Sequence, residues 1–336
     1  MAGSRPLRRI QFGRQSAFDS GAVATYKYRG KGTILDNAVV QRINADVGIV
    51  GGTTDLTNIP MTGGGLALGP DVASFEQMLH LSEMSIKTVT PVQDGTGADP
   101  YIFTYPFPTT AIQTFKYYTV EGGDNQQEEE MINCFCKDWT LSGSARNPYQ
   151  LSANLQGGTV TPSTFTADPG LITHNNMNFG MTKVYFDVVS GTIGTTQVSN
   201  TVRGLNFKYV GMQAKDTADG RLDFSFAQEA DQEGQIILDI EFEHDVVAVA
   251  QKVLWRAKTP RLLQIKVEGS TAFANAGDTY SVPTMLLNLA GYWENFGKIG
   301  ESNGNDIVSG KFICAYNSTA ALRGTLILAV ALSAVP

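Results

Sequence analysis

The sequence has 336 residues, of which 42% are hydrophobic and only 17% are charged, and its formal net charge is −7. A typical soluble domain has roughly a quarter of its residues charged, so we expect part of the polar surface to be covered by other molecules. The acidic balance argues against a protein built to hold nucleic acid, because sustained phosphate binding needs a basic surface.

The charge is unevenly distributed along the chain. Residues 1–31 contain seven basic side chains against the single acidic Asp19, and the remaining residues carry the opposite sign. The seven are Arg5, Arg8, Arg9, Arg14, Lys27, Arg29 and Lys31. A cationic arm on an acidic body can contact another copy of the same chain. A solvated basic tail is the alternative, and both remain open at this stage.

The first half of the chain is dominated by strand patterns. Apolar and polar residues alternate from Val39 to Ile49, which predicts a half-buried strand. A glycine-rich loop follows, and apolar residues at helical spacing then predict an amphipathic helix over 71–84. Further strands are expected at 101–107, 113–121, 131–142 and 149–156.

The second half begins after a Thr-rich and Asn-rich stretch at 157–180, which predicts a long loop or linker. Residues 246–258 place apolar side chains along one face of a second helix, and Pro260 ends it. Strands are expected at 182–190, 202–211, 221–227, 234–244, 261–268, 283–294, 307–316 and 324–333. The short apolar run near the C-terminus is far below the roughly 20 residues that span a bilayer as a helix.

The order of these elements suggests a duplication. Each half has strands, one helix and then more strands, and the two helices begin about half a chain apart. We therefore expect a mainly β fold of the sandwich or barrel type, with one flanking helix in each of two units. The expected boundaries are 1–158 for the first unit, 159–180 for a linker or loop, and 181–336 for the second.

One strand carries an array of carboxylates. Residues two apart on a strand share a face, so Asp239, Glu241 and Glu243 are expected to point one way, and the apolar residues between them the other. Paired carboxylates can hydrolyse glycosides, but nothing in the pattern gives one of them a raised pKa. A charged strand face is the favoured interpretation.

No other constellation predicts catalysis or a cofactor. Cys134, Cys136 and Cys314 are too few for a disulfide scaffold, and the three histidines are too scattered for a metal site. The glycine-rich segments lack the Lys and Ser/Thr of a phosphate-binding loop, and no nucleophile elbow is present. We therefore expect no catalytic, cofactor-binding or metal-ligating residues, and no enzyme.

Several segments resemble the tail tube, or major tail, proteins of long-tailed bacteriophages of the siphovirus type. The resemblance covers most of the chain, through loose patterns and the order of elements. The segments are IQFGRQSAFDSGAVA, RINADVGI, FEQMLHLSEM, CKDWTLSGSARNPYQLSANLQGG, GKFICAYNS and RGTLILAVAL. The long segment 157–180 departs from the family pattern.

The resemblance implies a virion protein, assembled in the host cytoplasm, whose rings stack into a tube that conducts DNA without binding it specifically. It implies rings of three copies with pseudo-sixfold symmetry, or of six. The implied partners are other copies, the tape measure protein, the tail terminator and tail-tip proteins, with no membrane contact. In such a tube, Asp239, Glu241 and Glu243 are candidates to line the channel.

Two alternatives to a tail tube subunit remain. One is another virion component, such as a capsid or decoration protein. The other is a carbohydrate-binding β-sandwich module, which the plentiful aromatic residues would suit if they were exposed.

Overall fold

The computed structural model describes residues 7–43, 48–50, 57–97, 100–229 and 236–336. Most of their regular structure is antiparallel strand, so the expected mainly β fold is confirmed. The strands of the first half are β1 Arg9–Arg14, β2 Tyr26–Lys27, β3 Gly32–Asp36, β4 Val39–Arg42, β5 Thr57–Met61, β6 Gly64–Val72, β7 Val92–Gln93, β8 Tyr101–Pro106, β9 Tyr118–Gly123, β10 Glu128–Ser144, β11 Gln150–Gly157 and β12 Val160–Pro162.

The second half is also built mostly from strands. They are β13 Thr182–Val188, β14 Gln197–Val198, β15 Val202–Val210, β16 Met212–Lys215, β17 Phe226–Glu229, β18 Ile236–Glu243, β19 Arg261–Glu268, β20 Thr284–Phe296, β21 Gly300–Ser302, β22 Asn305–Cys314 and β23 Gly324–Val330. Helix α1 spans Phe75–Ser85, helix α2 spans Val246–Arg256, and the 3-10 turn η2 covers Phe179–Met181.

The order of paired strands repeats between the two halves. We define the first unit as β1–β12 with α1, in which neighbours run β2, β1, β9, β10, β11, β6, β3. The second unit comprises β13–β23 with α2, in which they run β14, β13, β19, β20, β22, β18, β15. Each of these seven strands therefore has a counterpart in the other unit, and α1 and α2 follow the counterpart strands β6 and β18.

The long strands β10 and β20 change partners in the same way. The first part of β10 pairs with β9 and β12, and its later part with β11. The first part of β20 pairs with β19 and β23, and its later part with β22. Both ladders have a one-residue irregularity at the change, at Lys137 in β10 and at Glu294 in β20. A β-bulge of this kind bends a strand from one layer into the next.

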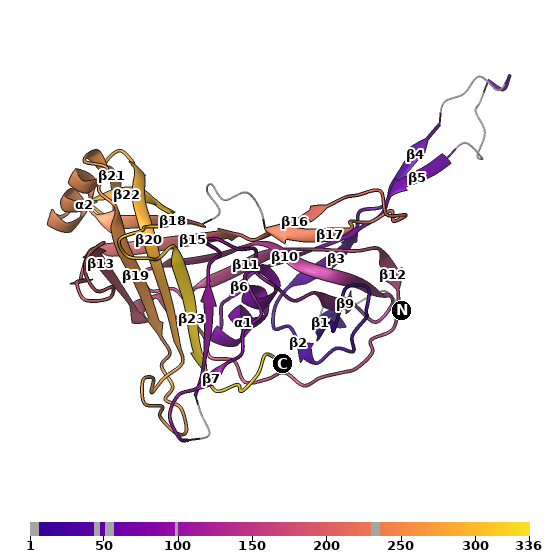
Figure 1. Ribbon diagram of the computed structural model, residues 1–336, viewed down its shortest axis with the longest axis horizontal. Coiled ribbons are helices and arrows are strands. Elements are labelled where there is room, and N and C mark those ends of the chain that lie inside the picture. Colours follow the sequence, from indigo (N-terminus) through magenta and orange to yellow (C-terminus); the bar gives the residue numbers. More distant parts are fainter. Residues whose placement is uncertain (1–6, 44–47, 51–56, 98–99, 230–235) are drawn as a thin grey trace.

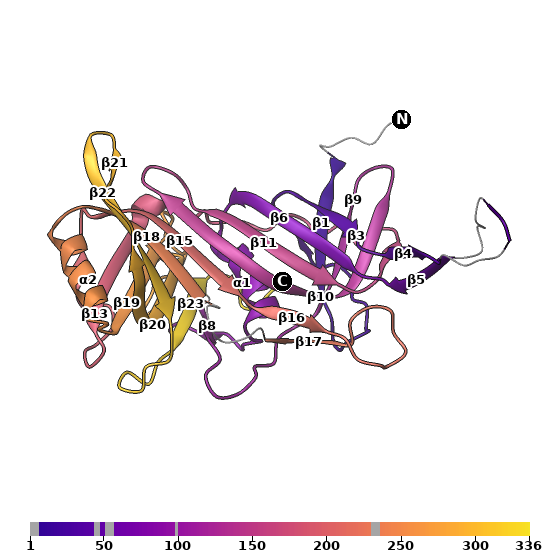
Figure 2. The same cartoon turned by 90° about the horizontal axis from the view of Figure 1, so that it is seen from above.

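A ladder between β10 and β15 joins the units into one continuous sheet. Figure 2 shows this sheet from above, from β3 and β6 through β11, β10 and β15 to β18, with α1 behind it. Residues 86–117, between α1 and β9, have no long counterpart after α2. They carry β8, which pairs with β23 of the second unit and so ties the units together a second time.

Helix α1 begins four residues later than the sequence pattern suggested. Residues 71–72 still belong to β6, and the Ser74 side chain caps the helix by accepting a hydrogen bond from the Gln77 N–H. A serine followed three residues later by Glu or Gln is a known start signal, so the expected start at residue 71 is wrong. All eleven residues of α1 are buried, whereas an amphipathic helix was expected.

Helix α2 begins where expected, at Val246, after the N-cap Asp245. Its orientation differs from the expectation, because Ala248 and Gln251 are its buried residues. The apolar residues that were expected to pack inward, including Val246, Val249 and Val253, are exposed.

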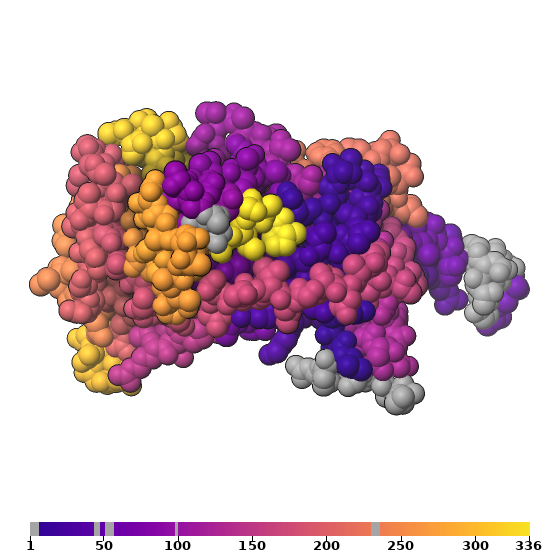
Figure 3. Space-filling view, turned by 90° about the horizontal axis from the view of Figure 1, so that it is seen from below, coloured from indigo at the N-terminus to yellow at the C-terminus, as the bar shows by residue number. Residues whose placement is uncertain are grey.

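The segment after β12 is tightly held by the first unit. The Glu121 carboxylate accepts hydrogen bonds from the Thr166 N–H and hydroxyl, and Glu76 accepts two from Asn175. Residue Met177 is fully buried. In Figure 3 the segment runs as a rose-coloured band across the underside, from the first unit toward the second.

Candidate assembly surfaces

The junction between the two units has two parts. The first is the antiparallel ladder of β10 with β15, which runs from Asp138 opposite Val210 to Ser144 opposite Gly204. The second is the two-stranded ribbon β16–β17, here called the second arm, which leaves β15 and lies along the first unit (Figure 1). The second unit thus offers an edge strand and an arm, and the first unit covers both.

The second arm is packed by specific contacts. Gly211 N–H donates to the Lys137 carbonyl at 2.8 Å, and Ala227 N–H donates to the Tyr117 hydroxyl at 2.9 Å. Met212 and Phe224 are buried against Phe135 of β10 in a small apolar cluster. These contacts bury both the base of the arm and the surface that it covers.

The first unit carries the same two features, but they are open. The counterpart of β15 is β3, and among the described residues only β6 pairs with it. The counterpart of the second arm is the ribbon β4–β5, here called the first arm. It projects away from the body in Figure 1, and every residue of its two strands is exposed. The half-buried strand expected at 39–49 is therefore wrong: the strand ends at Arg42, and residues 44–47 lie outside the described part.

Individual counterparts show the same contrast. Phe135 in β10 is 0% exposed, whereas its counterpart Tyr292 in β20 is 42% exposed. Met212 at the start of the second arm is 0% exposed, whereas its counterpart Val39 at the start of the first arm is 42% exposed. Tyr292 and Val39 are thus the counterparts of the two residues that meet at the inter-unit junction, but within the described structure they do not meet each other. They lie at opposite ends of the molecule.

A cavity of about 600 Å³ lies beside Tyr292, between the end of α2 and β20. Its walls include Trp255, Pro260 and Trp293, and its lining is largely apolar. The indole N–H of Trp255 donates to the Glu294 carbonyl at 2.9 Å, which fixes one wall. In the first unit the corresponding place is filled by Gly211 and Met212.

Most of the predicted basic arm is bound within the chain. Arg14 donates to the buried Glu83 carboxylate, Arg9 and Lys27 pair with Asp168, and Arg29 donates to the Val72 carbonyl. Arg5 lies outside the described residues. The basic side chains available to another molecule are therefore fewer than the sequence suggests.

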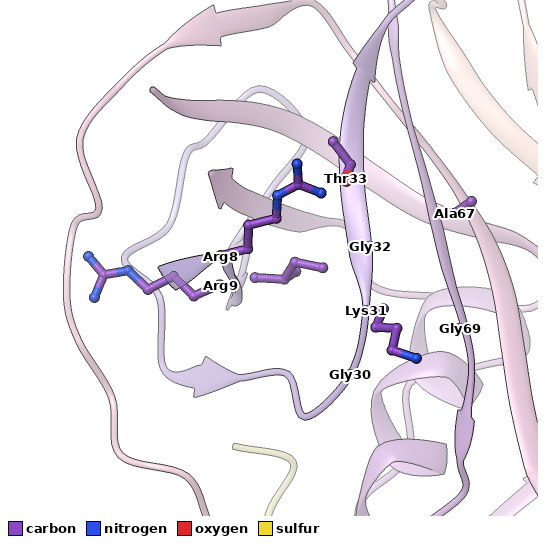
Figure 4. Close-up of a pocket in the computed structure, with 9 residues that line it drawn as sticks. Arg8, Arg9, Gly30, Lys31, Gly32, Thr33, Ala67 and Gly69 are labelled. Carbon is purple, nitrogen blue, oxygen red and sulfur yellow. The ribbon is translucent and has the colours of Figure 1, made fainter. Parts of the chain in front are cut away.

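Two members of that set face an open space beside β3. Arg8 and Lys31 line a cavity of about 420 Å³, and among the described residues neither side chain has an ion-pair partner. In Figure 4 the Arg8 guanidinium extends toward Thr33, and Lys31 lies further along the same strand. The open edge of β3 is therefore flanked by positive charge.

The carboxylate strand has the predicted alternation. Ile236, Leu238, Ile240 and Phe242 are buried, and Asp239, Glu241 and Glu243 lie on the other face of β18. Arg203 lies 3.8 Å from Glu241 and 3.0 Å from Glu243. Asp239 lies opposite Lys311 in the neighbouring strand. Arg203 thus serves two of the three carboxylates, and Lys311 forms its ion pair with Glu294, so the acidic face keeps an excess of negative charge.

The face of the sheet that carries these carboxylates has no helix over it in Figure 2. Its other outward positions include small neutral polar side chains, such as Thr140 and Ser142 of β10 and Ser152 and Asn154 of β11, and also the charged Asp138 and Lys208. The described part of this face therefore offers neutral hydrogen-bonding groups and carboxylates, and no strip of basic residues.

Two buried titratable groups are held in their neutral forms. Burial lowers the pKa of His80 to about 3 and raises the pKa of the Cys314 thiol to about 12, which keeps both neutral. Across the described ranges, no cluster of three potential metal ligands occurs. In the same ranges, no helix is long and apolar enough to cross a membrane. The surfaces that distinguish this molecule are the open edge of β3, the cavity beside Tyr292 and the first arm.

Comparison with known protein families finds no family model that matches this chain, and comparison with curated proteins finds no matching sequence.

Proposed function

We propose that the chain is a structural subunit that assembles head to tail into rings, and that the rings stack into a tube. The observation that carries this proposal is the contrast between the covered junction inside the chain and its two uncovered counterparts at the ends. A surface that meets a different surface on the next copy makes a heterologous contact, which forms a closed ring when the rotation per copy allows it.

The open polar face supports a role as a conduit. Edge strands joined from copy to copy would continue the sheet, and its helix-free face would then line one side of the assembly. A channel for DNA must avoid adhesion, and adhesion to phosphate requires clustered Lys and Arg. The carboxylates and neutral polar side chains of this face suit passage of DNA, because neither kind of group adheres to phosphate. Together with the sequence resemblance, this favours a phage tail tube protein of the virion.

Electron microscopy of the purified protein over a concentration series tests the proposal. We expect rings or hollow tubes whose abundance rises with concentration, because each contact between copies is bimolecular. A monodisperse monomer at every concentration up to the solubility limit would refute the proposal. DNA added to the assembled tubes should not bind to their outer surface, as measured by cosedimentation.

A further inference from the structure

The inter-unit junction predicts the residues that meet between two copies. The irregularities at Lys137 and Glu294 align β10 with β20, so that Asp138, Trp139 and Thr140 correspond to Asn295, Phe296 and Gly297. In the inter-unit ladder these β10 residues lie opposite Val210, Tyr209 and Lys208 of β15. The register therefore assigns Asn295, Phe296 and Gly297, at the end of β20, to one side of the contact between copies.

The other side follows from the pairing of the central strands. Phe207 of β15 lies opposite Leu238, which lies opposite Phe312. Ile34 of β3 lies opposite Leu66, which lies opposite Leu155, the counterpart of Phe312. Ile34 therefore corresponds to Phe207, and Leu35 and Asp36 correspond to Lys208 and Tyr209.

We propose that β3 of one copy pairs antiparallel with the end of β20 in a second copy, with Asp36 opposite Phe296 and Leu35 opposite Gly297. In the same contact, Val39 of the first arm enters the cavity beside Tyr292, as Met212 packs on Phe135 inside the chain. This inference rests on the self-assembly proposed above and names the surfaces that perform it.

Charge and shape both agree with this register. Beyond Gly297 the contact continues along β21, where Glu301 comes level with Lys31, and Lys31 and Arg8 line the same cavity. The exposed side chain of Val39 meets a cavity whose walls include Trp255, Tyr292 and Trp293, beside the charged residues Arg256, Lys258 and Glu294. Burying an apolar side chain against such a wall favours association, and the opposite charges fix the orientation.

A disulfide tests the register. The double variant Leu35→Cys/Gly297→Cys places one thiol on each open edge, and directly opposite strand residues lie within disulfide reach. We expect assembled protein under mild oxidation to form a covalent ladder on non-reducing gels, and the largest species counts the copies in a ring. The three native thiols do not interfere, because all are buried.

The matched control is Leu35→Cys/Asn295→Cys, in which the second thiol is two residues out of register. Diagonal positions are about 7–8 Å apart, so we expect at least tenfold less cross-linked product. Assembled protein that cross-links equally in both variants, or in neither, would overturn the inference while leaving self-assembly intact. Failure of the wild-type chain to assemble would instead refute the proposed function.

A second pair of variants tests the cavity. Val39→Asp should raise the concentration needed for assembly by at least tenfold, because it places a carboxylate against aromatic walls. Val40→Asp adds the same charge one residue along, on the opposite face of the strand, and should change it less than threefold. Both residues are exposed in the single chain, so both variants should keep the wild-type melting temperature. Equal effects of the two variants on assembly would contradict the assigned insertion of Val39.

Discussion

The two units share one strand order, but their helices are packed differently. Helix α1 packs against β10 of the first unit and β23 of the second, and all its residues are buried. Helix α2 lies at the end of the second unit and contacts mainly β20. The insertion 86–117 and the segment after β12 provide extra layers around α1. Equivalent positions in a repeated fold can therefore differ in what they contribute to stability.

The largest expected difference concerns the first residue of each helix. Phe75 is 0% exposed, whereas its counterpart Val246 is 83% exposed. Phe75→Ala should lower the free energy of unfolding by about 3–5 kcal/mol, because it leaves a cavity in the core. Val246→Ala should change it by less than about 0.5 kcal/mol. Urea denaturation of monomeric protein measures both, and similar losses would show that the two helices do not differ as described.

An ion pair beneath α1 gives the next largest effect. Arg14 donates two hydrogen bonds to the fully buried carboxylate of Glu83, which also accepts from the Tyr118 hydroxyl. Arg14→Met should cost roughly 3 kcal/mol, because removing one partner strands a buried charge.

The matched control is Lys183→Met in β13, whose partner Glu268 is near the surface. Exposed pairs contribute about 0–1 kcal/mol. If chemical denaturation gave the two variants equal losses, the Glu83 carboxylate would not depend on Arg14 as the structure indicates.

A pH effect sharpens the comparison further. His80 of α1 stacks on Tyr26, and among the described residues its ring nitrogens have no hydrogen-bond partner. Burial lowers its pKa to about 3, with the nearby Arg14 acting in the same direction. In the unfolded chain, His80 has an ordinary pKa near 6.5. It therefore binds a proton at pH values at which the folded chain keeps it neutral. Stability must therefore fall as the pH is lowered below about 6.5.

Between pH 6.5 and pH 5 we expect His80 to contribute a loss of about 2 kcal/mol, measured by urea denaturation at each pH. His80→Leu should remove this contribution, whereas His174, whose pKa burial lowers to about 4, keeps its own loss of stability over the same pH range. Glu76 acts in the opposite sense above its usual pKa of about 4.5, because burial raises its carboxyl pKa, so the contribution of His80 is measured as the difference between wild-type and His80→Leu protein at each pH. Hydrogen exchange should locate the weakening at α1 rather than α2, and a slope unchanged by His80→Leu would contradict the assignment.

Local patterns were sufficient to predict much of the fold. Strand 261–268 was predicted at its observed bounds, and the alternation in β18 placed its apolar residues correctly. The start of α1 was missed because the helical spacing outweighed the Ser74 and Gln77 cap signal. The exposed side of α2 could not be inferred, because an apolar stripe has the same pattern whether it packs within the chain or remains open.

The candidate surfaces were predicted less completely, for a physical reason. Arg14 and Arg29 are bound by residues about 70 and 147 positions away, and no local pattern reveals such partners. The alternation around Val39 is also ambiguous, since an arm that projects from the body uses the same residue types as a half-buried strand. The free edge of β3 became visible only when its counterpart β15 was seen paired.

The inter-unit ladder of β10 and β15 also has a kinetic meaning. Because both strands belong to one chain, this contact forms at an effective concentration set by the connecting segment, which is in the millimolar range for short tethers. The contact between copies has the same geometry but must form at the concentration of free chains. Because the two units are joined covalently, half of the unit-to-unit contacts form within one chain and do not depend on the protein concentration. Assembly therefore begins from a pair of units that is already formed.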